Sequence, residues 1–302
     1  MNWSGCGTAL VTPFTENGDL DEVAIARLAR RQIDGGVHFL VPCGTTGESP
    51  TLSHAEKLRV VELVVAEAAG KVPVLAGAGG NDTRSVVSLA GDMVDRGADG
   101  ILSVTPYYNK PSPEGLYQHY RTLAESIDSP IIVYNVPGRT GCNISPATLR
   151  RLASIPNVVG VKEASGNLSQ MCAVCRDAPE GFSVLSGDDA FTLAVMAMGG
   201  VGVISVAANE VPTEMVRLVD AALGGDLTTA RATHERLFPL MTVNFIESNP
   251  IPVKAALAEM GLLQARYRLP LVPPEASARD RIADVLQALG LLADAPRRAS
   301  SG

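Results

Sequence analysis

The sequence lacks the features that mark membrane proteins and nucleic-acid-binding proteins. It has no run of about 18 apolar residues, which argues against a transmembrane helix. It has no basic cluster, and its formal net charge is −7, which argues against nucleic acid and anionic membranes as partners. No basic stretch followed by an apolar segment opens the chain, so no signal peptide is predicted and we expect a cytoplasmic protein.

Residues that build disulfide frameworks and metal centres are also few. Five cysteines in 302 residues are an odd number in a long chain, which fits a reducing compartment. Cys172 and Cys175 form a C-x-x-C motif, but without a second pair we interpret them as two small residues on one helix face rather than as zinc ligands. The four histidines are scattered along the chain. We therefore expect neither a metal nor another cofactor.

Lysine is scarce as well, since only five of the 25 Lys and Arg residues are lysines. Four of them lie beside polar or turn-forming residues or near an expected helix start. The fifth, Lys162, ends the apolar run VVGVK (158–162). A positive charge at the end of an expected core strand therefore needs a chemical explanation.

What the sequence does contain is a regular alternation of apolar and helical segments. Eight short apolar runs occupy 7–14, 37–44, 72–79, 99–106, 130–137, 158–165, 182–189 and 201–208. Segments with helical spacing separate them, and a capping box of Ser53 and Glu56 opens one of these. Near-continuous apolar strands alternating with helices indicate a parallel sheet buried on both faces. Eight such units favour a (β/α)8 TIM barrel over a doubly wound sheet.

After residue 208 only helical patterns remain. We expect helices at 212–224, 226–247, 251–261 and 277–293. They would complete the last barrel helix and add a small C-terminal helical appendage. The expected domains are a catalytic barrel, 1–224, and a helical region packed on it, 225–302. The final RRASSG is expected to be a loose tail.

In a TIM barrel the functional residues lie at the carboxyl ends of the strands. In this sequence those positions hold Thr45, Thr46, Tyr107, Tyr108, Tyr134, Lys162, Gly187, Ile204 and Ser205. A desolvated lysine has a lowered pKa, so more of it is the free amine, which attacks a ketone and forms a Schiff base. Tyr and Thr hydroxyl groups can relay the protons that this chemistry requires.

Each of these side chains also has a structural interpretation. Lys162 could form an ion pair with Glu163 or another carboxylate. Tyr134 could be a core aromatic whose hydroxyl group is hydrogen-bonded, and Thr45 and Thr46 could cap the segment that follows them. On position alone, the sequence leaves Schiff-base chemistry and these structural roles open.

Two further motifs point to carboxylate binding. The Gly-bounded turn GTTGE (44–48) can hold a carboxylate on its backbone N–H groups. Arg139 follows a Pro-Gly turn and could clamp a second carboxylate, although it could also be solvated. Asp188 and Asp189 are expected to cap a helix rather than to bind a metal. The loop after the last apolar run has no glycine, so no phosphate-bearing substrate is predicted.

Several stretches together resemble the dihydrodipicolinate synthase family, within the pyruvate-dependent class I aldolases that also include N-acetylneuraminate lyase. They are GTTGES, TPYYNKPSPEGLYQHY, YNVPGRTG, GVKEASGN, LSGDD, GVISVAAN and NPIPVK. These stretches fall within about residues 7–275. GTTGE and the lysine alone indicate only the superfamily, whereas the Y-x-x-P-x-R-T-G and K-E-A-[ST]-G-N patterns make the resemblance specific.

The resemblance implies the catalytic roles. Lys162 would form a Schiff base with pyruvate, and Tyr134 would be the general acid and base beside the imine. Thr45 would link Tyr134 to Tyr108 in a proton relay, with Tyr108 reaching into the neighbouring subunit's site. Family members are usually homotetramers built as a dimer of dimers, so we expect the same assembly here.

The resemblance also implies the substrates. Thr45 and Thr46 would bind the carboxylate of pyruvate, and Arg139 would bind that of L-aspartate 4-semialdehyde. Gly187 and Ile204 would add main-chain contacts. The implied product is 4-hydroxy-tetrahydrodipicolinate, which feeds diaminopimelate and L-lysine biosynthesis.

Three other functions remain open from the sequence. They are a related aldolase acting on a sugar acid, a metal-dependent barrel enzyme, and a non-catalytic relative that binds a keto acid. Arg139 favours a substrate with a carboxylate near its aldehyde, because YNVPGRTG offers no groups for several sugar hydroxyls. The scattered histidines and carboxylates argue against the metal enzyme.

The family's feedback site for L-lysine is only partly present. The matching residues are Ser49, His54, Asn81 and Tyr107. Lys57 stands where regulated members have a second histidine, and Ser85 where they have a glutamate that holds the ammonium group of the effector. A lysine side chain in that pocket repels a cation, and the missing carboxylate removes its partner.

We therefore predict weak or absent inhibition by L-lysine. Titration of the catalytic activity with L-lysine measures this directly. Strong inhibition at sub-millimolar L-lysine would contradict the prediction.

Overall fold

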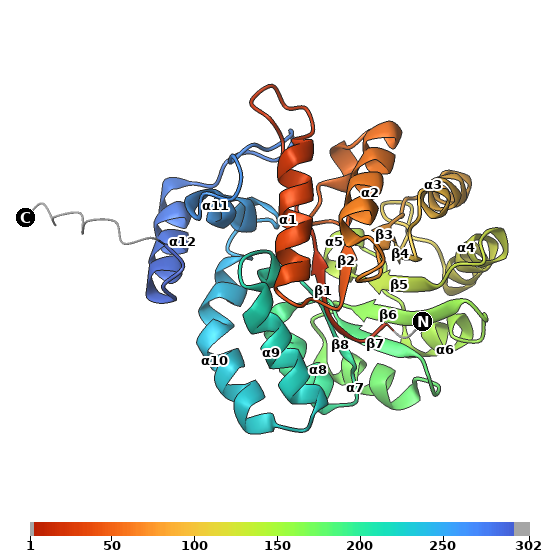
Figure 1. Ribbon diagram of the computed structural model, residues 1–302. Helices are drawn as coiled ribbons and strands as arrows, with labels where there is room; N and C mark the ends of the chain where they lie inside the picture. The colour runs from red at the N-terminus through yellow and green to blue at the C-terminus, as the bar shows by residue number, and fades with distance from the viewer. Residues whose placement is uncertain (1–2, 293–302) are drawn as a thin grey trace, which may run out of the picture.

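Eight parallel strands form a closed barrel in the computed structural model, which describes residues 3–292 (Figure 1). The strands are β1 (Gly5–Ala9), β2 (Phe39–Val41), β3 (Leu75–Gly77), β4 (Gly100–Val104), β5 (Ile131–Asn135), β6 (Val158–Glu163), β7 (Ser183–Ser186) and β8 (Gly202–Ser205). Their spatial order is β2-β1-β8-β7-β6-β5-β4-β3. The Leu40 N–H donates to Pro73 O over 3.0 Å, which joins β2 to β3 and closes the sheet. The predicted TIM barrel and each predicted strand are confirmed.

Helices follow the strands and form the outer layer. They are α1 (Glu22–Asp34), α2 (His54–Ala68), α3 (Thr83–Asp95), α4 (Pro113–Ser126), α5 (Pro137–Thr140), α6 (Pro146–Leu152), α7 (Leu168–Asp177), α8 (Thr192–Ala197) and α9 (Pro212–Leu223). The predicted capping box is present, with Ser53 and Glu56 bonding to each other's backbone at the start of α2. None of the helices in residues 3–292 has the length and apolar character needed to cross a membrane.

Three more helices follow the barrel: α10 (Leu227–Val243), α11 (Ile251–Glu259) and α12 (Ala276–Ala288). They confirm the predicted helices to within a few residues, and the predicted tail lies outside the described residues. Figure 1 shows them together on one side of the barrel, beside α1 and α9. Leu28 of α1 packs with Val253 and Leu257 of α11 in one buried cluster. We propose that the chain divides at the turn between α9 and α10, near residue 224.

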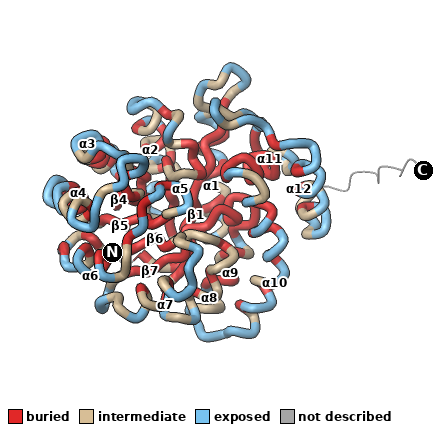
Figure 2. The backbone as a smooth tube through the Cα atoms, turned by 180° about the vertical axis from the view of Figure 1, so that it is seen from behind, coloured by how far each residue is buried: buried red, intermediate tan, exposed pale blue. Residues whose placement is uncertain are grey.

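The barrel encloses a small apolar core, and a larger one lies between the strands and the helices. Inward-facing residues from different strands share the inner cluster, including Phe39, Leu102, Ile132 and Leu185. Trp3 lies edge-on to Phe39, with ring centroids 5.4 Å apart. Figure 2 shows that buried backbone runs through the centre while exposed segments follow the outer helices. The barrel is therefore a packed core rather than a pore, and a site can form only at its ends.

The pairing of β8 with β1 requires glycine at one point. Gly202 has φ +151°, and a Cβ there would lie 2.0 Å from Gly5 O. We expect Gly202→Ala to destabilise the protein by more than about 3 kcal/mol, because it adds an overlap with rigid backbone to the cost of strained φ. Gly199→Ala is the matched control, since Gly199 has φ +103° with open space around it. Urea denaturation measures the free energy of unfolding of both variants. An equal decrease in the two variants would contradict the overlap argument.

Candidate active site

Strand register places the two central side chains of the site next to each other. Tyr134 of β5 is the direct partner of Lys162 in β6. Both side chains therefore leave the sheet on the same face, toward the barrel interior. The ammonium nitrogen of Lys162 lies 4.4 Å from the centre of the Tyr134 ring.

Lys162 is buried, and no carboxylate among residues 3–292 forms an ion pair with it. Its exposed fraction is 5%, and burial lowers its pKa from 10.5 to about 8, with Asp189 and Asp188 opposing and Arg139 reinforcing the shift. The suggested pair with Glu163 is absent, because adjacent strand residues point to opposite faces. Glu163 instead accepts hydrogen bonds from Asn135 and from the Ser165 amide. Lys162 thus has the lowered pKa that a nucleophilic amine needs.

Tyr134 lies against the Lys162 amine and beside Thr45. It is buried, which raises its pKa, while the Arg139 charge and the Thr45 hydroxyl group lower it and Asp188 raises it. A tyrosine with a raised pKa is protonated at neutral pH and can donate to a neighbouring oxygen. Thr45 comes from the loop after β2, so the two hydroxyl groups converge from different strands.

The GTTGE loop presents free amide groups. Within the loop, the N–H groups of Gly47 and Glu48 donate to the carbonyls of Gly44 and Thr45 over 3.1 Å. The N–H groups of Thr45 and Thr46 have no backbone acceptor among residues 3–292. Neighbouring backbone N–H groups without a backbone acceptor can bind a carboxylate.

Asn249 connects the loop to Arg139, a link that the sequence interpretation missed. Its side-chain amide donates to the Thr46 hydroxyl over 3.0 Å, and its carbonyl accepts from the Arg139 guanidinium over 3.2 Å. Asn249 opens the NPIPVK motif, which matched the family without suggesting a role. The two expected carboxylate-binding groups are therefore held by one residue from the C-terminal region.

A cleft of about 280 Å³ opens beside these groups. Among the residues lining it are Thr45, Tyr134 and Arg139. Lys162 does not line the cleft itself, but its amine lies against the ring of Tyr134, which does line it. A small keto acid in the cleft would therefore meet Tyr134 and Thr45 next to the amine.

The residues of the expected feedback site do not all line one pocket. Ser49, Lys57 and Tyr107 line the same cleft as the catalytic candidates. The others turn to different partners: His54 bonds to Asp92, Ser85 to Asp82, and the Asn81 carbonyl accepts from Asn109. No carboxylate lines the cleft, and the expected weak binding of a lysine ligand stays a prediction.

Tyr108 is not brought to Lys162 within this chain. Its exposed fraction is 88%, and its φ of +73° is rare for a residue with a side chain. Gly187 directly follows β7 at the barrel mouth, whereas Ile204 lies within β8. The Gly187 N–H donates to Glu163 O over 2.8 Å, and Ile204 is fully buried in the inner core.

The two aspartates after β7 have different roles. Asp188 caps the short helix Asp189–Phe191, as expected. Asp189 does not cap it, because its carboxylate accepts from the amides of Val206 and Ala207 after β8. Among residues 3–292, no group of three His, Cys, Asp or Glu could hold a metal ion. Cys172 and Cys175 lie in α7 as free thiols.

Burial of the Lys162 amine should lower the free energy of unfolding of the protein. Below pH 8 Lys162 is protonated in both the folded and the unfolded chain. Burying its charge then lowers the free energy of unfolding by about 3 kcal/mol, which corresponds to the difference between the ordinary pKa of 10.5 and the pKa of about 8 in the folded chain. This cost disappears as pH rises from 8 to 10.5. We therefore expect Lys162→Met to raise the free energy of unfolding at pH 7 and to lose this advantage by pH 10.5.

Urea denaturation at both pH values tests the expectation, with the exposed Lys71→Met as the control. A variant less stable than the unmodified protein at pH 7 would contradict it.

Comparison with known proteins agrees with this geometry. Residues 2–289 match the Dihydrodipicolinate synthetase family. The chain is 51% identical to the 4-hydroxy-tetrahydrodipicolinate synthase of Koribacter versatilis, covering 98% of this chain and 99% of that protein. It is similar to the crystal structure of dihydrodipicolinate synthase from Aquifex aeolicus, with a TM-score of 0.94 at 44% identity over 97% of this chain and 100% of that one. It is also similar to the crystal structure of the chloride-inhibited dihydrodipicolinate synthase from Acinetobacter baumannii complexed with pyruvate. The TM-score is 0.94 at 41% identity, and the match covers 96% of this chain and 99% of that one. The chain belongs to the dihydrodipicolinate synthetase family.

Proposed function

We propose that the chain condenses pyruvate with L-aspartate 4-semialdehyde to give 4-hydroxy-tetrahydrodipicolinate, a step in diaminopimelate and L-lysine biosynthesis. Membership of the family supports the reaction. The observation that carries the mechanism is the buried, unpaired Lys162, whose pKa is lowered to about 8 beside Tyr134. A pKa of about 8 leaves a fraction of the amine unprotonated near neutral pH, and the unprotonated amine is the form that attacks a ketone to give a Schiff base.

The reaction follows from that amine. The Lys162 nitrogen attacks the keto carbon of pyruvate, and loss of water gives a protonated imine. A proton then leaves the methyl carbon, and its electron pair forms an enamine. The enamine carbon attacks the aldehyde carbon of the second substrate, whose oxygen takes up a proton. The substrate's own amine finally attacks the imine carbon, which closes the ring and releases Lys162.

Each proton transfer needs a group near the imine, and Tyr134 fills that role. Burial keeps its hydroxyl group protonated at neutral pH, so it can donate to the departing water. Thr45 lies beside it and can pass protons onward. The N–H groups of Thr45 and Thr46, which have no backbone acceptor among residues 3–292, would hold the pyruvate carboxylate. Arg139, anchored by Asn249, would hold that of the aldehyde substrate.

We also propose that the protein works as a homotetramer built from two dimers. The support is Tyr108, an aromatic side chain that is 88% exposed and has a strained backbone. Such strain persists where the surroundings require it. A neighbouring subunit that receives Tyr108 would bury the side chain and complete the relay through Thr45. All five cysteines are free thiols, which supports a cytoplasmic location.

Borohydride reduction in the presence of pyruvate tests the mechanism. We expect the reduced imine to be trapped as an adduct on Lys162, located by mass mapping of peptides. Lys162→Ala should give no adduct and no condensation activity. An adduct elsewhere, or full activity in Lys162→Ala, would overturn the mechanism. Coupled assays with N-acetylneuraminate or 2-keto-3-deoxygluconate in place of aspartate semialdehyde separate this function from a sugar-acid aldolase.

A further inference from the structure

A second lysine is buried more deeply than Lys162. Lys254 lies in α11 with an exposed fraction of 0%. Its amine lies 2.5 Å from a carboxylate oxygen of Glu48, which is equally buried. Glu48 is the last residue of the GTTGE loop and has a left-handed φ of +52°. The ion pair therefore joins the C-terminal helices to the loop that carries Thr45 and Thr46.

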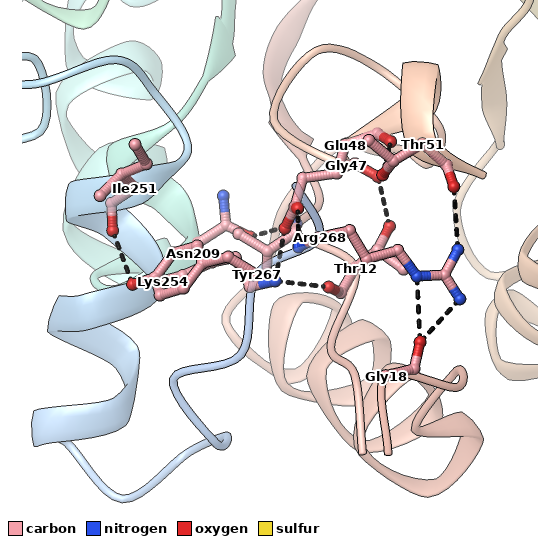
Figure 3. A network of polar contacts seen from close by, with 11 residues as sticks. Thr12, Gly18, Gly47, Glu48, Thr51, Asn209, Ile251, Lys254, Tyr267 and Arg268 are labelled. Carbon is pink, nitrogen blue, oxygen red and sulfur yellow. Dashed lines mark hydrogen bonds and ion pairs between the residues drawn. The ribbon is translucent and has the colours of Figure 1, made fainter. Parts of the chain in front are cut away.

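Further contacts hold both members of this pair (Figure 3). The Lys254 amine also donates to Thr12 O over 3.1 Å and faces the Phe14 ring at 4.4 Å. The other oxygen of Glu48 accepts from the Arg268 amide over 3.2 Å. Each of the two charged groups thus has a partner in addition to the opposite charge.

The same short segment contacts the loop at a second point. Asn249 donates to the Thr46 hydroxyl, and Lys254 binds Glu48 five residues later. Both attachments come from a segment about 200 residues away from the loop in sequence. The GTTGE loop, which carries the N–H groups of Thr45 and Thr46, is thus attached to the C-terminal region at two points.

Stability alone does not account for such a pair. Buried ion pairs can often be replaced by apolar side chains with no loss of stability, whereas removal of one partner leaves an uncompensated charge. In some proteins a buried polar or charged group is retained because it fixes a conformation. The conformation that it fixes here is the left-handed end of the substrate loop.

We propose that Glu48 and Lys254 are positioning residues for the proposed reaction, and that their ion pair holds the GTTGE loop in the orientation that binds the pyruvate carboxylate. The inference rests on the proposed function. Neither residue lines the cleft, so each acts through Thr45 and Thr46. Displacement of a binding group by about 1 Å costs on the order of a hundredfold in rate, so a small loop movement is enough to be measured.

The test uses Glu48→Gln, Lys254→Met and the double variant. Each single change should raise KM for pyruvate by about tenfold or more, with a smaller effect on KM for the aldehyde. The double variant contains no unpaired buried charge, so its Tm should return toward that of the unmodified protein. Its KM for pyruvate should remain raised. This separation of Tm from KM is the result that a merely structural pair would not give.

Leu286→Ala is the matched control, since Leu286 is fully buried in α12 and shares no cluster with the loop. It should lower Tm while leaving KM for pyruvate unchanged. The inference is overturned if the double variant regains normal KM for pyruvate together with its Tm, or if Leu286→Ala raises KM equally. Should Lys254→Met fail to fold, Glu48→Gln and the double variant still decide the matter.

Borohydride trapping with pyruvate keeps this test separate from that of the proposed function. If the unmodified protein gives no adduct, the proposed function fails. If it gives an adduct and the variants are trapped at the same pyruvate concentrations, only the inference about Glu48 and Lys254 fails.

Discussion

The loss of hydration at one amine governs the chemistry of this protein. Lys162 is placed by a parallel strand at the mouth of a barrel whose interior is filled by apolar side chains. Water that would stabilise the ammonium form is excluded, and no carboxylate replaces it, so the neutral amine becomes accessible. In the proposed reaction, the other groups of the site would bind the keto acid and transfer protons while this amine attacks the keto carbon.

The two buried lysines show how the surroundings decide what one residue type does. Lys162 has an aromatic ring against it and no direct counter-charge. Lys254 has a carboxylate, a carbonyl and two aromatic rings around it. The first environment favours a reactive neutral amine. The second favours a charged group with a fixed position, which suits an anchor rather than a nucleophile.

Much of the fold was predictable because parallel barrel strands are buried on both faces and therefore appear as short apolar runs. The convergence of Thr45, Tyr134 and Lys162 followed from the rule that strand ends meet at one face. The roles of Asn249 and Lys254 were not predictable in the same way, because they act through contacts across about 200 residues. No local pattern distinguishes a buried helical lysine from an exposed one near a helix start.

Asp189 shows a second limit of local reasoning. An aspartate before a helix is a good capping candidate, yet its carboxylate binds the backbone after the next strand instead. The preference for capping is real but weak, and two buried amides without acceptors outweigh it. Residues at strand ends therefore have partners on neighbouring loops that spacing along one segment does not reveal.

The position of α11 in the chain has a consequence for biosynthesis. Every side chain proposed to be catalytic lies before residue 209, but the segment that anchors Thr46 and Glu48 comes about 40 residues later. A growing polypeptide presents its amine and its tyrosine before it can hold the loop that receives the substrate. A segment synthesised after all the barrel strands thus completes the proposed site, and a nascent chain that ends before it would carry Lys162 without the contacts that hold the GTTGE loop.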